Sequence, residues 1–146
     1  MKRDYSVYPS MIGSEGGIIW SYDNFQAISL FDDTHPVEIS AAKYNNLSIC
    51  LWYVSPQWQF NDIARTKYAL LGEWNKWTAV SRQRFLSITT NTEKTQTTVV
   101  VQGAALETVP VVVYHGNLGS ITVNCAIPAT TGVANLVITP TNAVCS

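Results

Sequence analysis

The chain has 146 residues, of which 47% are hydrophobic and only 13% are charged. This length is typical of one domain, and the sparse charge is more typical of an extracellular β-protein than of a cytosolic enzyme. The formal net charge is −1, and the basic residues form no run longer than Lys2–Arg3. The chain therefore lacks the phosphate-facing basic surface that a nucleic-acid partner would need.

The sequence contains no run of about 18 apolar residues, and we therefore expect no membrane span. The start of the chain, MKRDYSVYPS, lacks the apolar stretch of a signal peptide. We interpret the protein as extracellular or secreted, with an N-terminus that is a processing site or a fragment boundary. A cytosolic chain is the alternative.

The N-terminal segment is set apart by the sequence GSEGG at residues 13–17, which has the composition of a flexible linker. We therefore divide the chain into an N-terminal extended segment with a glycine-rich hinge, residues 1–17, and a β-sandwich domain, residues 18–146. Tyr5, Val7 and Met11 lie at alternate positions before the hinge and predict an edge strand. This strand either packs on its own domain, is donated to the sheet of a neighbouring subunit, or is disordered. In the donated-strand reading these residues are the assembly candidates.

Short β-like runs separated by turn residues follow along the rest of the chain. Several of them alternate, with Thr97, Val99 and Val101 on one face of the strand expected there. The best helix candidate, residues 60–69, could hold only one turn. About ten strands at this spacing predict an all-β fold, an antiparallel Greek-key β-sandwich of about 8–10 strands. The expected strands are residues 18–22, 26–31, 37–41, 47–55, 68–71, 77–80, 84–90, 96–102, 109–114, 121–126 and 133–138.

The three cysteines do not have the spacing of a metal site. Cys50 lies in the apolar run SICLWYV, where we expect a core thiol. If the protein is secreted, Cys125 and Cys145 are the disulfide candidates, and their bridge would stabilise the C-terminus by about 3 kcal/mol. The redox state of the cysteines stays open. Asn46 is the glycosylation candidate, because Asn46-Leu47-Ser48 is the one sequon of the chain.

The most distinctive stretch of the sequence is residues 66–85. The apolar residues 68–71 begin a strand, and Gly72 permits a tight or bulged backbone. Glu73 and Lys76 are spaced to pair across the turn that follows, and Phe85 is expected in the core.

The run LLGEWNKWTAVSRQRF, residues 70–85, resembles the segment after the catalytic barrel in melibiase-type (family 27) α-galactosidase-like glycoside hydrolases. In that family an LxGExxKW-like motif precedes a VSxQRF-like motif. LSICLWYVSPQ resembles the preceding strand, GGIIWSYDNFQAISLFDDTHPVEIS resembles the entry to the β domain, and GSITVNCAIPATTGVANLVI is compatible with its last hairpin. The likeness covers roughly residues 16–138.

The resemblance implies a C-terminal antiparallel β domain without the catalytic part. The catalytic aspartates of the family lie on a (β/α)₈ barrel, which needs about 250 residues and cannot be built here. No catalytic residue is therefore carried over to this chain.

The remaining polar residues form no other recognisable active site. Asp32 and Asp33 lie in a turn-like sequence, with a calcium site as the alternative. His35 and His115 also lie in turn-like settings, where we expect surface or turn roles, and Ser81 has no obvious base nearby. We therefore expect no catalytic residue, no metal and no cofactor.

Aromatic side chains are the remaining candidates for ligand binding, because sugar rings stack their apolar C–H faces on flat aromatic rings. Trp20 and Trp52 lie inside expected strands and are interpreted as core residues. Trp58, Trp74 and Trp77 are the candidates for ligand stacking, with a core or interface role as the competing reading.

Three functions remain open. The first is a non-catalytic extracellular interaction module, either glycan-binding or an accessory domain of a glycoside hydrolase-like protein. The second is a self-assembling structural subunit of an extracellular filament that donates its N-terminal segment as a strand. The third is a fragment of an α-galactosidase-like enzyme. The expected partners are accordingly a carbohydrate or copies of the chain itself, in a homo-oligomer or polymer.

Overall fold

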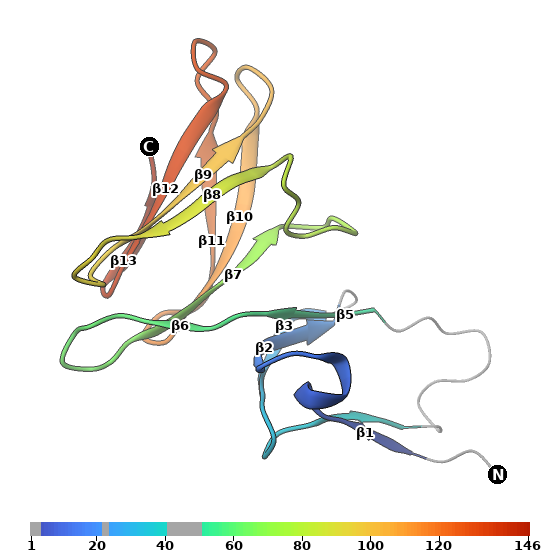
Figure 1. Cartoon of the computed structure of the whole chain (residues 1–146). Helices are drawn as coiled ribbons and strands as arrows, with labels where there is room; N and C mark the ends of the chain where they lie inside the picture. The colour runs from blue at the N-terminus through green and yellow to red at the C-terminus, as the bar shows by residue number, and fades with distance from the viewer. Residues whose placement is uncertain (1–3, 22–23, 41–50) are drawn as a thin grey trace. The chain divides into compact units, whose positions relative to one another are not determined.

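A computed structural model of the chain describes residues 4–21, 24–40 and 51–146 (Figure 1). The chain forms two compact units, Met1–Gln57 and Trp58–Ser146, whereas the sequence suggested a boundary after residue 17. Apart from one 3₁₀ helix, the regular structure of the described residues consists of antiparallel strands. The predicted all-β antiparallel sandwich is confirmed.

The second unit is an eight-stranded sandwich of two four-stranded sheets, ordered β11-β10-β7-β6 and β13-β12-β9-β8. Successive hairpins alternate between the two sheets, so β7 pairs with β10 and β9 pairs with β12 across intervening strands, as in a Greek key. The strands are β6 (Trp58–Gln59), β7 (Lys67–Glu73), β8 (Phe85–Thr90), β9 (Thr97–Gln102), β10 (Thr108–His115), β11 (Gly119–Ala126), β12 (Val133–Thr139) and β13 (Asn142–Cys145).

Alternating apolar residues of both sheets form the core of this unit. On β9, Thr97, Val99 and Val101 are buried while the residues between them are partly exposed, which confirms the predicted face. Such alternation places one side of a strand on the core and the other towards solvent. The core cluster comprises Phe60, Tyr68, Leu70, Phe85, Val99, Val101, Val109, Val111, Val113, Cys125, Ile127, Ala134, Leu136, Ile138 and Ala143.

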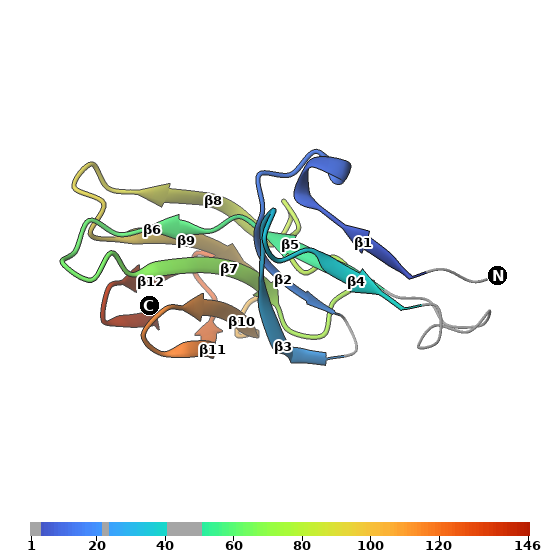
Figure 2. The same cartoon turned by 90° about the horizontal axis from the view of Figure 1, so that it is seen from below.

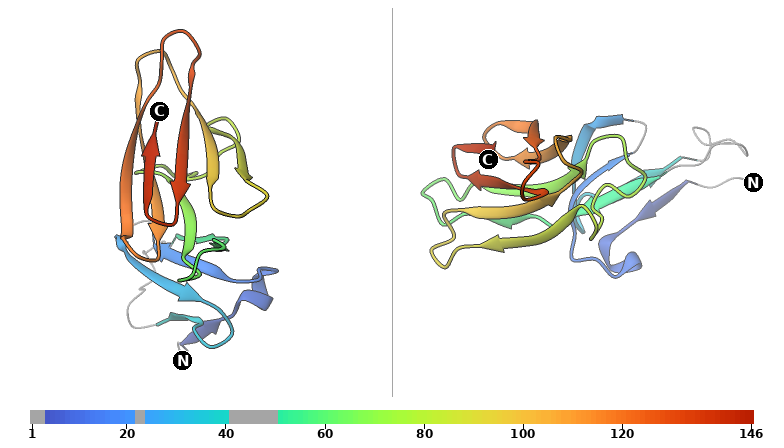
Figure 3. Two further views of the ribbon diagram at one scale, coloured as in Figure 1. Left: turned by 90° about the vertical axis from the view of Figure 1, so that its left-hand side faces the viewer. Right: turned by 90° about the horizontal axis from the view of Figure 1, so that it is seen from above.

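The predicted disulfide between Cys125 and Cys145 is present and joins β11 to β13. These are the outer strands of the two sheets on the same side of the sandwich, and Figure 3 shows their hairpins in orange and red side by side. The bridge therefore closes one edge of the core. Cys50 and Asn46 lie outside the described residues.

The first unit contains a three-stranded sheet, a two-stranded sheet and the 3₁₀ helix. The larger sheet has the order β3-β2-β5, and β1 pairs with β4 in the smaller one (Figure 2). Ile19, Phe31 and Val37 form a small core against which Val7 packs. The elements are β1 (Tyr5–Val7), the helix Pro9–Ile12, β2 (Gly17–Ser21), β3 (Asn24–Phe31), β4 (Val37–Ile39) and β5 (Trp52–Ser55).

Two glycines of the expected hinge are tightly packed. A Cβ at Gly16 would lie 2.3 Å from the Phe31 carbonyl oxygen, and one at Gly17 would lie 2.1 Å from the Ser55 carbonyl oxygen. Both glycines also have positive φ angles, 90° and 149°. Gly16 and Gly17 therefore allow the start of β2 to approach its neighbours closely. Amino-acid composition alone does not distinguish this packing role from a flexible hinge.

Two local expectations were wrong. Residues 77–80 form a loop instead of a strand. His115 is fully buried at the end of β10, with its Nε2 2.9 Å from the Thr139 carbonyl oxygen. A backbone carbonyl within reach makes that burial tolerable for an imidazole. No helix in the described part of the chain is long and apolar enough to span a membrane.

The disulfide provides a test of how the sandwich is closed. We expect the paired replacement Cys125→Ser with Cys145→Ser to lower the free energy of unfolding by about 3 kcal/mol, because the bridge no longer restricts the unfolded chain. Urea denaturation followed by tryptophan fluorescence measures the change. Reduction of the wild type should produce the same loss and should leave the variant unaffected. An unchanged midpoint in the variant would contradict a stabilising bridge.

Candidate functional site

The loop of residues 74–84 connects β7 to β8, and a β-bulge positions its start. The register of β7 against β10 shifts between Val112 and Val113, leaving an extra residue on β7 next to Gly72. Gly72 has a φ of 105°, and a Cβ there would lie 2.2 Å from the Ala79 carbonyl oxygen. The backbone N–H of Glu73 donates to that same oxygen at 2.8 Å. Of the tight or bulged backbone that Gly72 permits, the structure has the bulge, and it turns the loop back onto the strand end.

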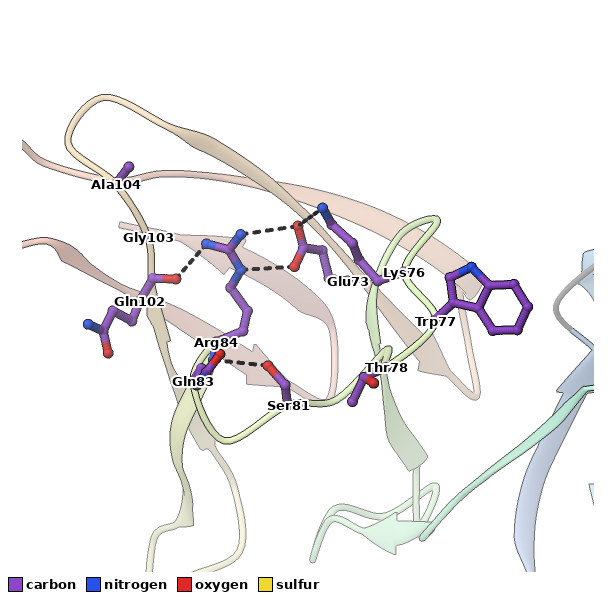
Figure 4. Close-up of a pocket in the computed structure, with 10 residues that line it drawn as sticks. All are labelled: Glu73, Lys76, Trp77, Thr78, Ser81, Gln83, Arg84, Gln102, Gly103 and Ala104. Atoms are coloured by element: carbon purple, nitrogen blue, oxygen red, sulfur yellow. Dashed lines mark hydrogen bonds and ion pairs between the residues drawn. The ribbon is translucent and has the colours of Figure 1, made fainter.

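Arg84 lies between two carboxylates, and we name Arg84, Glu73 and Glu107 the Arg84 cluster. Its Nε and Nη2 donate to Glu73 at 2.8 and 3.3 Å, and its Nη2 and Nη1 donate to Glu107 at 2.8 and 3.0 Å. Nη1 also donates to the Gln102 carbonyl oxygen at 2.7 Å (Figure 4). These contacts use the five N–H donors of a guanidinium. The cluster thus joins the end of β7, the start of β8 and the β9–β10 connection.

The contacts of Arg84 and Glu107 favour the charged forms of both side chains. Hydrogen bonds from Arg84, and then from the Ala104 backbone N–H, hold the pKa of Glu107 below its usual value. The hydrogen bond to Glu107 raises the pKa of Arg84 despite the desolvation that accompanies partial burial. The Arg84 and Glu73 side chains are only 18% and 10% exposed, so this pair is better protected from solvent than an ordinary surface pair.

Gly103 leaves the space that the cluster needs. A Cβ at this position would lie 2.6 Å from Glu107 Oε2 and 2.9 Å from Arg84 Nη1. Any larger residue would therefore require the Glu107 and Arg84 side chains to shift.

An open hollow of about 830 Å³ lies beside the Arg84 cluster. Its lining is mainly polar and includes Thr78, Ser81, Gln83 and Gln102 besides the charged residues (Figure 4). Ser81 Oγ accepts the backbone N–H of Arg84 at 3.2 Å. Trp77 belongs to the rim, and Figure 4 shows its indole pointing away from Arg84. The hollow thus combines hydroxyl and amide groups with an adjacent aromatic ring.

The predicted tryptophans divide into two groups. Trp77 and Trp74 both lie on the 74–84 loop and are 69% and 44% exposed. Trp58 lies on β6, stacks on Tyr68 with ring centroids 5.7 Å apart, and packs against the core. The loop therefore brings Trp77 to the hollow, whereas Trp58 contributes to packing.

The assembly candidates lie in different settings. Tyr5 is 64% exposed on β1, Met11 is 67% exposed on the 3₁₀ helix, and Val7 faces the small core of the first unit. Within the described part of the chain, β1 pairs with β4 of the same chain.

The Asp32 turn uses its carboxylate internally. Oδ1 of Asp32 accepts from the Thr34 hydroxyl at 2.7 Å and lies 2.8 Å from His35 Nδ1. These hydrogen bonds, led by that of Thr34, lower the pKa of Asp32. This geometry favours the turn role over a calcium site. Among residues 4–21, 24–40 and 51–146, no three His, Cys, Asp or Glu side chains gather as a metal site.

The sequence did not identify Glu107 and Gly103 as parts of the site. Glu107 pairs with Arg84, which lies 23 positions away in the sequence. The sequence signal that could have indicated an acidic partner is Arg84 itself. A basic residue next to a core strand needs a group that compensates its charge when it is partly buried.

No family model, curated protein or solved structure matches this chain. The resemblance to melibiase-type hydrolases stays a prediction.

The ionisation of Glu107 gives a pH-dependent test of the cluster. Because its pKa is lowered in the folded chain, its stabilisation is complete above the unfolded value of about 4.3 and declines as the pH falls through the folded pKa. We therefore expect the difference in unfolding free energy between wild type and Glu107→Gln to shrink from about pH 6 to about pH 3. Urea denaturation at each pH measures it.

The control for this test is Glu93→Gln, on the exposed turn between β8 and β9, which removes the same charge. The difference in unfolding free energy between this control and the wild type should vary much less with pH. A difference for Glu107→Gln that stayed constant would show that the carboxylate contributes nothing as an ion.

Proposed function

We propose that the chain is a non-catalytic, extracellular β-sandwich module that binds carbohydrate at the 74–84 loop. The observation that carries this proposal is the 69% exposure of Trp77 at the rim of a polar hollow. A flat indole accepts the apolar C–H face of a sugar ring, and nearby hydroxyl and amide groups hydrogen-bond to sugar hydroxyls. A large apolar side chain exposed beside convergent polar groups is typical of a binding surface.

The anchoring of the loop supports this role. The ion pair between Arg84 and Glu73 links the two ends of the loop, and the hydrogen bond from Glu73 N–H to the Ala79 carbonyl oxygen crosses it. A recognition loop on a rigid sandwich loses little conformational entropy when a ligand binds.

The extracellular part of the proposal is supported by the disulfide between Cys125 and Cys145. Disulfides persist in oxidising compartments and are rare in the cytosol. A module that binds polysaccharide outside the cell would meet those conditions.

The state of the carboxylates supports a role without catalysis. A glycosidase of the usual kind needs one carboxyl group that holds a proton and can donate it. Here Glu73 and Glu107 both pair with the guanidinium of Arg84, and the pKa of Glu107 is lowered. If the chain instead belongs to a longer α-galactosidase-like enzyme, the catalytic residues would lie on a barrel outside these residues.

A binding assay tests the Trp77 site directly. In affinity electrophoresis each gel contains one polysaccharide, and we expect the wild type to be retarded by at least one of them. Trp77→Ala should weaken that binding about tenfold or more. Leu118→Ala is the matched control, because it removes another exposed apolar side chain, 48% exposed, on the β10–β11 turn.

Equal loss in both variants, or no retardation by any polysaccharide, would contradict carbohydrate binding at this loop. The same preparations should release no sugar from α-galactosides. Hydrolysis by the purified chain would overturn the non-catalytic part of the proposal.

Self-assembly is the second candidate function, and the surface of residues 5–12 favours it. Tyr5, Met11 and Ile12 are 64%, 67% and 55% exposed. The β1–β4 ladder contains only three residue pairs. If β1 paired instead with β4 of a neighbouring copy, each chain would give up only this short ladder of its own.

Sedimentation velocity and electron microscopy test this alternative. If copies exchange β1, deletion of residues 1–12 should convert any polymer to monomer, because the donated strand is gone. Tyr5→Ser with Met11→Ser is the companion variant, since it keeps the β1 backbone and removes the exposed apolar surface. Polymers that persist in the deletion variant would rule out strand donation.

A further inference from the structure

We infer that the hollow beside Arg84 selects neutral saccharides and rejects acidic ones, an inference that rests on the proposed carbohydrate binding. A cation beside a sugar site ordinarily suggests recognition of a carboxylate or sulfate group, because guanidinium groups bind such anions in a bidentate manner. The contacts of Arg84 lead to the opposite expectation.

The hydrogen-bonding capacity of Arg84 is already used. Its five N–H groups are directed to Glu73, Glu107 and the Gln102 carbonyl oxygen at 2.7 to 3.3 Å. An acidic sugar could reach the guanidinium only by displacing one of these carboxylates. The displaced carboxylate would then lose its ion pair in a place where it is partly shielded from water.

The charges around the hollow also balance. Glu73 and Glu107 are opposed by Arg84 and by Lys76, whose Nζ lies 3.8 Å from Glu73 Oε1. A carboxylate or sulfate that entered would meet two fixed carboxylates as well as the cations. The net electrostatic attraction for an anion is therefore small.

The other groups of the lining suit uncharged hydroxyls. Thr78, Ser81, Gln83 and Gln102 carry hydroxyl and amide groups, which both donate and accept hydrogen bonds. Neutral sugar hydroxyls can exchange hydrogen bonds with such groups without separating an ion pair.

Gly103 maintains this neutral state. Because a Cβ would lie 2.6 Å from Glu107 Oε2, glycine is the residue that lets the second carboxylate stay on Arg84. The position therefore contributes to selectivity by leaving room for the ion pair.

The experiment compares immobilised neutral and acidic polysaccharides, for instance galactomannan and β-glucan against polygalacturonate and heparin. Biolayer interferometry is run at about 20 mM and about 500 mM NaCl. The wild type should bind a neutral polysaccharide with less than about twofold change between the two salt concentrations, and should bind neither acidic polymer.

The decisive variant is Glu107→Ala, which removes one carboxylate from Arg84 and leaves two guanidinium donors unused. We expect it to gain binding to polygalacturonate or heparin that disappears at high salt. Glu93→Ala, which makes the same charge change on the β8–β9 turn, should show no such gain. Circular dichroism confirms folding, and Glu107→Gln replaces Glu107→Ala if the alanine variant does not fold.

The outcomes separate the two proposals. If the wild type binds no polysaccharide, carbohydrate binding itself fails. If it binds acidic polymers more tightly than neutral ones and Arg84→Met abolishes that binding, selectivity for neutral sugars is overturned while carbohydrate binding stands. A folded Glu107 variant with no more affinity for acidic polymers than Glu93→Ala would also overturn the selectivity.

Discussion

The ion pairs that Arg84 makes with Glu73 and Glu107 connect the two sheets of the sandwich. Glu73 ends β7 and Glu107 precedes β10 in one sheet, whereas Arg84 precedes β8 in the other. A partly buried guanidinium is costly unless its charge and its donors are compensated, so these ion pairs favour the arrangement in which the three segments meet. The disulfide between Cys125 and Cys145 adds a covalent link between the sheets, on β11 and β13.

The same interaction determines what the surface offers to a ligand. Because the charge of Arg84 is compensated by Glu73 and Glu107, the cluster anchors the 74–84 loop without creating a strongly cationic patch. The loop can then expose Trp77 beside hydroxyl and amide groups. Stability and the proposed recognition therefore depend on one set of contacts, and the proposed preference for neutral sugars rests on how completely those contacts are satisfied.

The first unit shows how composition can suggest a role that packing changes. Gly16 and Gly17 read as a flexible hinge, yet their backbones approach the carbonyl groups of Phe31 and Ser55 too closely for any side chain. Of the edge strand predicted in the N-terminal segment, Tyr5–Val7 exists, whereas Met11 lies on the 3₁₀ helix. Val7 packs against the core of its own unit. Self-assembly through this segment would thus be an exchange of an existing pairing.

The sequence by itself determined the all-β class, most strands, the special backbone at Gly72 and the candidate disulfide. These features depend on local alternation, on one residue without a Cβ, or on a small set of cysteines. Only the tertiary structure decided that Glu107 is the partner of Arg84, and that Trp77 is exposed while Trp58 packs against the core. Local patterns do not encode which distant segments meet, because that depends on how the hairpins alternate between the two sheets.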